Sequence, residues 1–353
     1  MTKLQNLTGN RRMANVEESS ILDSSNISPH FFSDSPTYIK LRNLKTKPKR
    51  FFYYLSTPRD KRKKFEKEAD THQQLQVAKC WEQFIQLYFN NKLTSYSFKT
   101  KKLFSHEKII WQYWGQGVDS LDLPDIVKLC FKSVDKNRGE YTVIRLDDSN
   151  IRDYLDLPEF VWEKRVNPQF KHAFFADLLR LALLEVYGGV WLDATIYLSS
   201  PLSDLTSQTD FFMYQRDTTK TEREAWISFN RHYFSWEESH KINVLNSIIY
   251  AKKQSYVIHT CLNLLLNFWR TQEHIPHYFF FQIMFDSLIN NQLANYQCEI
   301  VDDTKTHLLL KALDKQFDKN YFQEIVTQTN THKLSYNKQP KELSFYQYLL
   351  ENT

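Results

Sequence analysis

The sequence predicts an α/β fold in which helices flank a mostly parallel sheet and an added helical segment precedes the core. Between about residues 108 and 198, hydrophobic runs typical of strands alternate with helix-like segments, which indicates parallel strands joined by helices. The 353 residues, 42% of them hydrophobic, suffice for one large domain or two smaller ones. Glycine is scarce, and we expect each one to mark a sharp turn or a close approach of the backbone. Five of the six glycines are Gly115, Gly117, Gly139, Gly188 and Gly189.

The first 105 residues are expected to lie outside the core. Residues 1–50 are rich in Ser, Asn, Thr and Lys and lack periodicity, so we expect a flexible or partly ordered arm. Residues 51–105 then form a basic helical segment, because apolar residues recur at three- and four-residue steps from Arg59 to about Asn90. Between Lys40 and Lys67 the chain carries twelve basic and two acidic residues. This run predicts a solvated helix face, and the alternative is contact with anionic lipid headgroups or a diphosphate-bearing acceptor.

The expected elements of the core follow in a regular order. Proline is favoured in the first turn of a helix, and acidic residues suit helix N-caps. In the first half we expect the strand Ile109–Trp114 with a glycine turn, a helix over 124–134 starting at Pro124, the strand Tyr141–Leu146, a capping turn at Asp147 and Asp148, a helix over 170–187, and the strand Val190–Leu198. In the second half we expect strands at Phe211–Gln215, Trp226–Phe229 and Ile248–Ala251, and helices over 255–270, 276–292 and 305–326.

Composition excludes several classes of protein. The four cysteines are far apart and have no metal-site or redox spacing, so we expect reduced, buried thiols and a cytoplasmic location. The polar N-terminus and the lack of a long apolar run predict no signal peptide and no membrane span. The net charge of +5 is mild and no nucleic-acid-binding motif is present, so nucleic acid is not an expected partner.

Two charged residues in an otherwise apolar helix indicate the candidate site. The helix from His172 to Tyr187 is apolar almost all the way round, which is typical of an interior helix. Asp177 and Arg180 lie three residues apart in it and therefore share a face. Because buried charges must be paired or face a polar cleft, the two residues form either a structural ion pair or part of a binding site.

The segment that follows favours the binding site. Gly188 and Gly189 end the helix, and a short hydrophobic strand then leads to Asp193. A lone aspartate at the carboxyl end of a strand is well placed to meet a hard cation. Mg²⁺ or Mn²⁺ needs only one or two protein carboxylates when substrate phosphates supply further oxygens.

This segment resembles the capsular polysaccharide synthesis glycosyltransferases and, more distantly, the glycosyltransferases with a DXD-containing sugar-binding region. Their pattern is Ser-Asp-x-Leu-Arg, an apolar run, then Tyr-Gly-Gly-x-Trp/Tyr-x-Asp. Here it reads Ala-Asp-Leu-Leu-Arg over 176–180 and Tyr-Gly-Gly-Val-Trp-Leu-Asp-Ala-Thr over 187–195. The blocks Ile109–Gly117 and Thr331–Tyr336 also match, and the resemblance covers about residues 105–340. Ala176 replaces the serine, and Thr195 stands where the distant relatives have a second aspartate.

The resemblance implies a GT-A-type, Rossmann-like domain over 106–340 and a role for each matching residue. Residues 106–200 would form the nucleotide-sugar half and 201–340 the acceptor half, followed by a tail over 341–353. The residues implied in catalysis are Asp177, Arg180 and Asp193; in nucleotide-sugar binding Trp111, Tyr113, Trp114, Asp177, Arg180 and Lys333; and in binding Mn²⁺ or Mg²⁺ Asp193, Thr195 and His332. Taken without the resemblance, Trp111 and Trp114 fit a hydrophobic core equally well, and His332 is one histidine among 11.

The activity implied is transfer of a hexose from a nucleotide diphosphate sugar, UDP-type by preference, to a glycan hydroxyl in capsular or other surface polysaccharide synthesis. We expect retention of configuration; an inverting enzyme would need a base, for which Glu237, Glu238 and Asp286 are candidates. A polyprenyl-diphosphate-linked acceptor at the inner face of the cell membrane would fit the basic N-terminal segment. The alternatives are a sugar-phosphate transferase and a non-catalytic carbohydrate-binding scaffold of a polysaccharide assembly complex.

Overall fold

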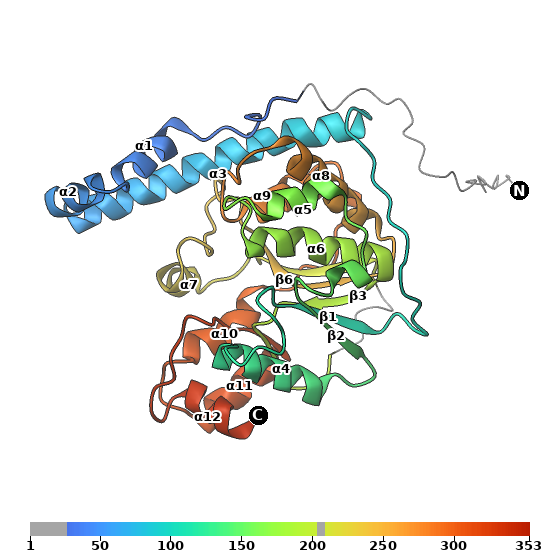
Figure 1. Ribbon diagram of the computed structural model, residues 1–353. Coiled ribbons are helices and arrows are strands. Elements are labelled where there is room, and N and C mark those ends of the chain that lie inside the picture. Colours follow the sequence, from blue (N-terminus) through green and yellow to red (C-terminus); the bar gives the residue numbers. More distant parts are fainter. Residues whose placement is uncertain (1–26, 203–208) are drawn as a thin grey trace, which may run out of the picture.

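A five-stranded mixed sheet forms the centre of the molecule. The computed structural model describes residues 27–202 and 209–353, and Figure 1 shows the sheet between two layers of helices. The strand order is β2-β1-β3-β6-β5, with β1 parallel to β2 and β3, and β6 antiparallel to both of its neighbours. The strands are β1 (Ile109–Tyr113), β2 (Thr142–Leu146), β3 (Gly189–Leu192), β5 (Phe211–Gln215) and β6 (Val244–Ala251). The predicted α/β class is confirmed, and the antiparallel β6 makes the sheet mixed.

Helices cover both faces of this sheet, as Figure 1 shows. One layer contains α3 (Arg59–Phe89), α5 (Glu159–Arg165), α6 (His172–Tyr187), α8 (Tyr256–Thr271) and α9 (Phe280–Ile289). The other contains α4 (Asp125–Asn137), α10 (Thr304–Ala312), α11 (Lys319–Gln328), α12 (Phe345–Asn352) and a two-stranded sheet of β4 (Ile196–Leu198) and β7 (Thr331–Lys333). Every residue of β1, β3, β5 and β6 is buried, as expected for a sheet that is covered on both sides.

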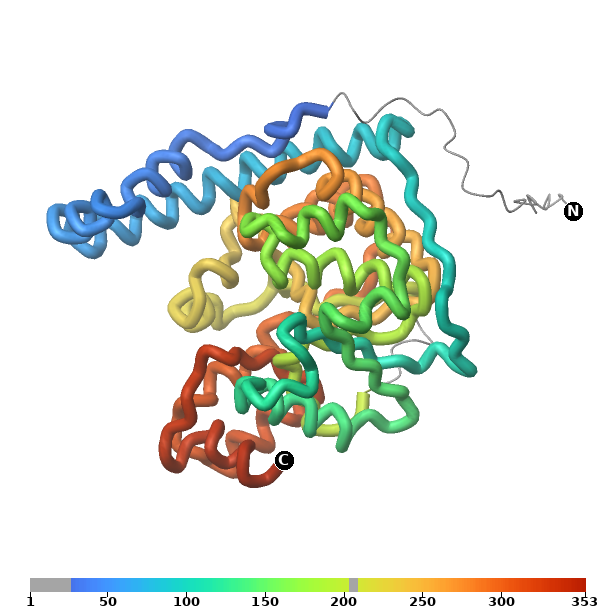
Figure 2. Tube along the Cα trace, in the orientation of Figure 1, coloured from blue at the N-terminus to red at the C-terminus, as the bar shows by residue number. Residues whose placement is uncertain are grey.

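The remaining elements lie outside these layers. Helices α1 (Pro36–Leu44) and α2 (Lys49–Ser56) fold back along the first half of α3, and Figure 2 shows this hairpin projecting beyond the rest of the chain. Helix α7 (Arg223–Phe229) and the short 3₁₀ turns η2 (Ile151–Asp153) and η3 (Ala294–Tyr296) complete the set. Across residues 27–202 and 209–353, no helix has the length and apolar content needed to cross a bilayer.

Several predicted boundaries need correction. The single strand expected over Val190–Leu198 is two strands in different sheets, because the chain turns at Asp193, where the Ile196 amide donates to the Asp193 carbonyl. The segment Trp226–Phe229 is part of helix α7 and not a strand; four residues are too few for periodicity to decide. The helix expected over 305–326 is divided into α10 and α11. The arm predicted for 1–50 contains α1 and the start of α2, while residues 1–26 lie outside the described residues.

The turn between α6 and β3 requires its two glycines. Gly188 has φ 72° and Gly189 has φ 100°, which residues with a side chain rarely adopt. A Cβ atom on Gly189 would lie 2.5 Å from the Ile109 carbonyl oxygen, so the turn packs directly against the start of β1. This close approach fixes where β3 begins, and Asp193 directly follows this four-residue strand.

Candidate functional site

Arg180 is at the centre of a buried polar cluster at the carboxyl end of β3. Its Nε atom donates to the Ala176 carbonyl at 3.0 Å, and its Nη1 atom donates to the Asn246 carbonyl at 2.6 Å. The guanidinium also lies 3.2 Å from an Asp177 oxygen and 3.4 Å from an Asp193 oxygen. Arg180 thus connects its own helix to β6 and to the end of β3, and the face that it was predicted to share with Asp177 is realised.

Asp193 accepts hydrogen bonds from two sides. The Trp191 Nε1 atom donates to Oδ1 at 2.8 Å, and the Lys333 ammonium donates to Oδ2 at 2.8 Å. The same ammonium donates to the Thr195 hydroxyl at 2.8 Å. Lys333 reaches this position because β7 pairs antiparallel with β4, which begins directly after the Asp193 turn. The Asp193 side chain remains 23% exposed, so solvent reaches the cluster.

The two carboxylates have opposite pKa shifts. Burial alone would raise the pKa of Asp193, but the charges of Lys333 and Arg180 outweigh it and lower that pKa to about 2. Asp177 is more deeply buried, and burial together with the Asp193 charge raises its pKa to about 7 despite the nearby Arg180. Near neutral pH Asp193 is therefore fully ionised, while Asp177 changes protonation state.

Raising the pH should destabilise the wild-type protein more than the Asp177→Asn variant. Between the ordinary carboxyl pKa of 3.8 and about 7, folded Asp177 retains a proton that the unfolded chain has lost. The free energy of unfolding therefore falls as the pH rises through this window. Urea denaturation from about pH 5 to pH 8 measures the effect. If the free energy of unfolding changed with pH in the same way in both proteins, Asp177 would not be the group that causes the loss of stability.

Two further polar residues join the cluster from positions that the sequence did not single out. The Asn246 side-chain amide donates to Asp177 at 2.8 Å, and the Gln282 amide donates to the Asn246 side-chain oxygen at 3.0 Å. Tyr278 also adjoins the cluster: desolvation of its phenol, followed by the charges of Asp177 and Asp193, raises its pKa, although 65% of the residue surface remains exposed. An asparagine in a strand and a glutamine in a helix carry no motif, so only the fold could reveal them.

The aromatic residues expected to bind the nucleotide lie in different environments. Trp111 is fully buried among other aromatic rings, and its Nε1 atom donates to the Gly188 carbonyl at 2.9 Å, so it is a core residue and no base can stack on it. Trp114 is half-buried and packs edge-on against the exposed Tyr336, with ring centroids 5.6 Å apart. Of the two tryptophans, only Trp114 has a surface available to a nucleotide.

Tyr113 belongs to a second cluster at the end of β1. Its hydroxyl donates to Asp148 at 2.5 Å, and Asp148 also pairs with Arg165 at 2.5 Å. A Cβ atom on Gly115 would lie 2.4 Å from both the Tyr113 hydroxyl and the His172 ring, so the chain needs glycine there to pass this cluster. Asp148, which was expected only to cap a turn, also forms an ion pair with Arg165 beside the glycine turn that follows β1.

His332 is separated from the other predicted metal ligands. Successive residues of a strand point to opposite faces, so His332 points away when Lys333 reaches Asp193. The His332 ring is fully buried and contacts the Ser199 hydroxyl at 3.0 Å, and burial lowers its pKa to about 3. His332 is therefore not a ligand of a cation at Asp193. No group of three or more His, Cys, Asp or Glu side chains in metal-binding geometry occurs in the described part of the chain.

The oxygens of Asp193 and Thr195 nevertheless converge on one positive charge. The Lys333 ammonium lies 2.8 Å from each of them and occupies the point where a cation would be held. Two protein oxygens fit a divalent ion whose remaining ligands are phosphate oxygens and water. The residues present thus fit a metal that arrives with a nucleotide, with Lys333 as the stand-in cation.

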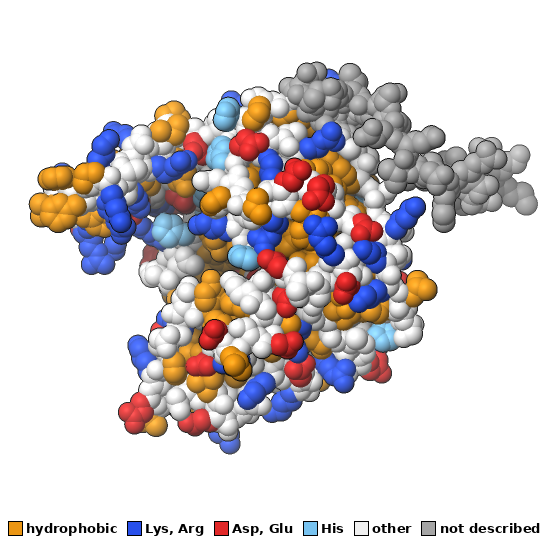
Figure 3. All heavy atoms as spheres, in the orientation of Figure 1, with side chains coloured by type: hydrophobic (Ala, Val, Ile, Leu, Met, Phe, Trp, Pro, Cys, Tyr) orange, Lys and Arg blue, Asp and Glu red, His pale blue; other side chains and the backbone are white. Residues whose placement is uncertain are grey.

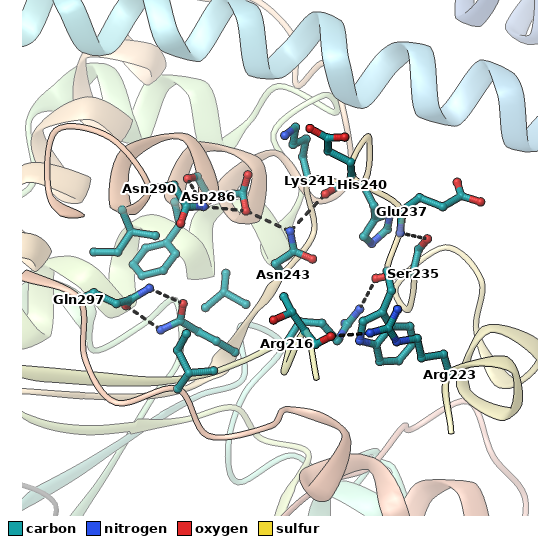
Figure 4. Close-up of a pocket in the computed structure, with 18 residues that line it drawn as sticks. Arg216, Arg223, Ser235, Glu237, His240, Lys241, Asn243, Asp286, Asn290 and Gln297 are labelled. Carbon is teal, nitrogen blue, oxygen red and sulfur yellow. Dashed lines mark hydrogen bonds between the residues drawn. The ribbon is translucent and has the colours of Figure 1, made fainter. Parts of the chain in front are cut away.

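A cavity of about 330 Å³ lies beyond this cluster, between the start of β6, helix α9 and the loop before β6. Figure 4 shows Asp286 and Asn243 meeting at its wall, where the Asn243 amide donates to Asp286 at 3.0 Å. On α9, Asp286 lies one helical turn after Gln282, and Asn243 directly precedes β6, the strand that carries Asn246. The three predicted base candidates, Glu237, Glu238 and Asp286, line this cavity and not the Asp193 cluster.

Comparison with known proteins supports the resemblance. The family model for capsular polysaccharide synthesis proteins matches residues 60–350, which include both polar clusters, the cavity and strand β7. No curated protein matches the chain.

Proposed function

This chain belongs to the family of capsular polysaccharide synthesis proteins, and we propose that it is a glycosyltransferase that takes a hexose from a nucleotide diphosphate sugar. The observation that carries the proposal is the arrangement at the end of β3. There Arg180 and Lys333, from segments far apart in the chain, approach one ionised carboxylate, Asp193, from two sides. Two cations beside a partly exposed site suit a substrate with several negative charges, and a diphosphate is such a substrate.

Hexosyl transfer requires stabilisation of the negative charge that develops on the leaving diphosphate. The bond between the anomeric carbon and the diphosphate oxygen breaks, its electron pair stays on the diphosphate, and the acceptor oxygen forms the new bond to that carbon. Arg180 and Lys333 stabilise the charge that accumulates on the diphosphate. In the retaining reaction that we propose, the acceptor's proton passes to the departing phosphate oxygen, and no dedicated base is needed. Asp193 orients the two cations before the substrate arrives.

A divalent cation fits the same point. Asp193 and Thr195 would hold it in the place of the Lys333 ammonium, and when bound it would supply further positive charge against the diphosphate. We propose that Asp177 and Asn246 bind sugar hydroxyls, because their polar atoms adjoin Arg180. Trp114 and Tyr336 offer aromatic faces to the nucleotide base.

The cavity beside Asp286 is the proposed acceptor site. It lies within residues 201–340, and two elements that line it, the start of β6 and helix α9, also carry Asn246 and Gln282 of the donor cluster. Hydroxyl-rich sugars require such paired amide and carboxyl groups for orientation.

A hydrolysis assay with nucleotide sugars tests the proposal. We expect slow release of nucleoside diphosphate from a matching donor, with Lys333→Ala reducing the rate about 100-fold because one charge on the leaving group is unbalanced. Asp286→Asn is the matched variant: it should leave donor hydrolysis unchanged and reduce transfer to the glycan. Release of nucleoside monophosphate would indicate a sugar-phosphate transferase instead. Failure of every donor to bind in a thermal-shift screen would indicate a non-catalytic scaffold.

Chelation distinguishes the contribution of a bound metal ion to donor hydrolysis from that of Lys333. We expect EDTA to lower wild-type donor hydrolysis about tenfold or more and Mn²⁺ to restore it, since two protein oxygens alone hold a cation weakly. A rate that is unaffected by EDTA would show that Arg180 and Lys333 alone neutralise the diphosphate.

A further inference from the structure

We propose that the free end of the α1–α2–α3 hairpin docks on an anionic lipid bilayer. We call this free end the tip and define it as residues 45–64, which comprise α2, the loops on either side of it and the start of α3. The proposal depends on three properties of the tip: its projection from the core, an exposed apolar face and a surrounding excess of positive charge. It does not depend on the proposed enzymatic activity.

The tip stands clear of the hydrophobic core. Helix α3 has 31 residues and is therefore about 46 Å long, and its buried positions begin only at Ala69. Within α2 only Tyr53 is buried, and it faces back into the hairpin. Figure 2 shows this end of the hairpin extending away from the rest of the chain. The tip can therefore enter the headgroup region of a bilayer without disturbing the central sheet.

One face of α2 presents large apolar side chains to solvent. Phe51 is 67% exposed, Phe52 is 63% exposed and Leu55 is 73% exposed. Because these residues are one, three and four positions apart, they lie on adjoining sides of a single helix turn. Exposed apolar residues grouped in this way mark an interaction site.

Positive charge surrounds this apolar face. Residues 45–64 contain nine basic residues and one acidic residue, Asp60. Figure 3 shows Lys and Arg side chains on both sides of the apolar end of the hairpin. Within the described residues, the basic side chains of the tip that form no ion pair are Lys47, Lys49, Arg50, Arg59, Lys61, Arg62, Lys63 and Lys64.

An anionic bilayer fits this combination better than a protein partner does. Aromatic and leucine side chains enter the boundary between headgroups and acyl chains, while surrounding lysines and arginines bind acidic headgroups. A stable protein interface buries about 800 Å² on each partner, and the convex end of two helices offers a narrow surface for that. The bilayer needs no complementary hollow.

Docking in this way would also orient the molecule. Glu66 and Lys67, about two turns from the start of α3, pair with Arg231 at 3.8 Å and Glu237 at 2.6 Å. Glu237 lines the proposed acceptor cavity, so the tip and that cavity open near the same end of α3. A lipid-linked acceptor would then meet the cavity at the membrane surface; this orientation, unlike the docking itself, rests on the proposed function.

Vesicle co-sedimentation of the full chain tests the docking. We expect binding to phosphatidylcholine vesicles that contain about 30% phosphatidylglycerol, little binding to pure phosphatidylcholine, and weakening with added NaCl. The triple variant Phe51→Ser/Phe52→Ser/Leu55→Ser should bind at least about tenfold more weakly. The matched control replaces three exposed apolar residues elsewhere, Leu103→Ser/Leu121→Ser/Val166→Ser, which are 96%, 93% and 85% exposed, and should bind like the wild type.

Three results would overturn the proposal. The first is equal binding of the wild type to neutral and anionic vesicles, and the second is unchanged binding of the tip variant. The third is that the wild type does not bind vesicles and is a dimer by light scattering, whereas the tip variant is a monomer. A cooperative thermal unfolding transition of the tip variant, like that of the wild type, serves as the fold check, because the tip lies outside the hydrophobic core. Vesicle binding without any donor hydrolysis would leave the docking intact and reject the glycosyltransferase instead.

Discussion

Asp193→Asn should reduce donor hydrolysis about 100- to 1,000-fold, because the substitution removes the charge that holds Arg180 and Lys333 in place for the diphosphate. Asparagine retains the shape of aspartate and an oxygen that can accept from Trp191, so the site should stay folded. The assay measures nucleoside diphosphate released by wild type and variant under identical conditions. If the variant kept more than about a tenth of the wild-type rate, the site would have to lie elsewhere.

The same variant should be less stable near neutral pH. The charges of Lys333 and Arg180 lower the pKa of Asp193 from 3.8 to about 2, so the ionised carboxylate stabilises the folded protein. This contribution is present above pH 3.8 and is lost as the pH falls through about 2. Asp135→Asn, which breaks an exposed pair with Arg145 on α4, is the control and should change neither hydrolysis nor stability appreciably.

Arg180→Met should be the most destabilising single substitution in the site, lowering the free energy of unfolding by about 3–5 kcal/mol. The substitution leaves Asp177 and Asp193 without their shared cation and leaves the Asn246 carbonyl without its donor. The double variant Asp177→Asn/Arg180→Met should recover part of the loss, because one of the two facing carboxyl groups is then permanently neutral. Urea denaturation of both variants measures the recovery.

A second buried arginine serves as the control. Arg216 is as deeply buried as Arg180 and pairs with Asp303 at 2.9 Å, and it lines the proposed acceptor cavity instead of contacting Asp193. Arg216→Met should also lose stability but should retain donor hydrolysis per folded molecule, whereas Arg180→Met should lose both. Equal hydrolysis by the two variants at matched folded fractions would show that Arg180 is only structural.

The sequence predicted those parts of the fold and site that depend on local patterns. The apolar helix with Asp177 and Arg180, the glycine turn and the strand leading to Asp193 all lie within one continuous segment, and the structure forms each of them. Trp111 was misjudged because β1 is buried on both faces, and in such a strand no alternation distinguishes a core tryptophan from a binding one.

The remaining differences have a common physical cause. Asn246, Gln282 and Tyr278 reach the site through strand pairing and helix packing between segments far apart in the chain, which periodicity does not encode. The turn that separates β3 from β4 follows from the pairing of β4 with β7, a partner more than 130 residues later. The sequence does not show which apolar residues of the tip are exposed, because this depends on how α2 packs, and within α2 only Tyr53 is buried.

The late position of β7 has a consequence for biosynthesis. A nascent chain emerging from the ribosome can fold its central sheet through β6, with Arg180 and Asp193 already in contact, long before Lys333 is translated. Until then the carboxylate faces a single cation, and the second arrives only when β7 pairs with β4. The site therefore acquires its second cation only after the central sheet is able to form.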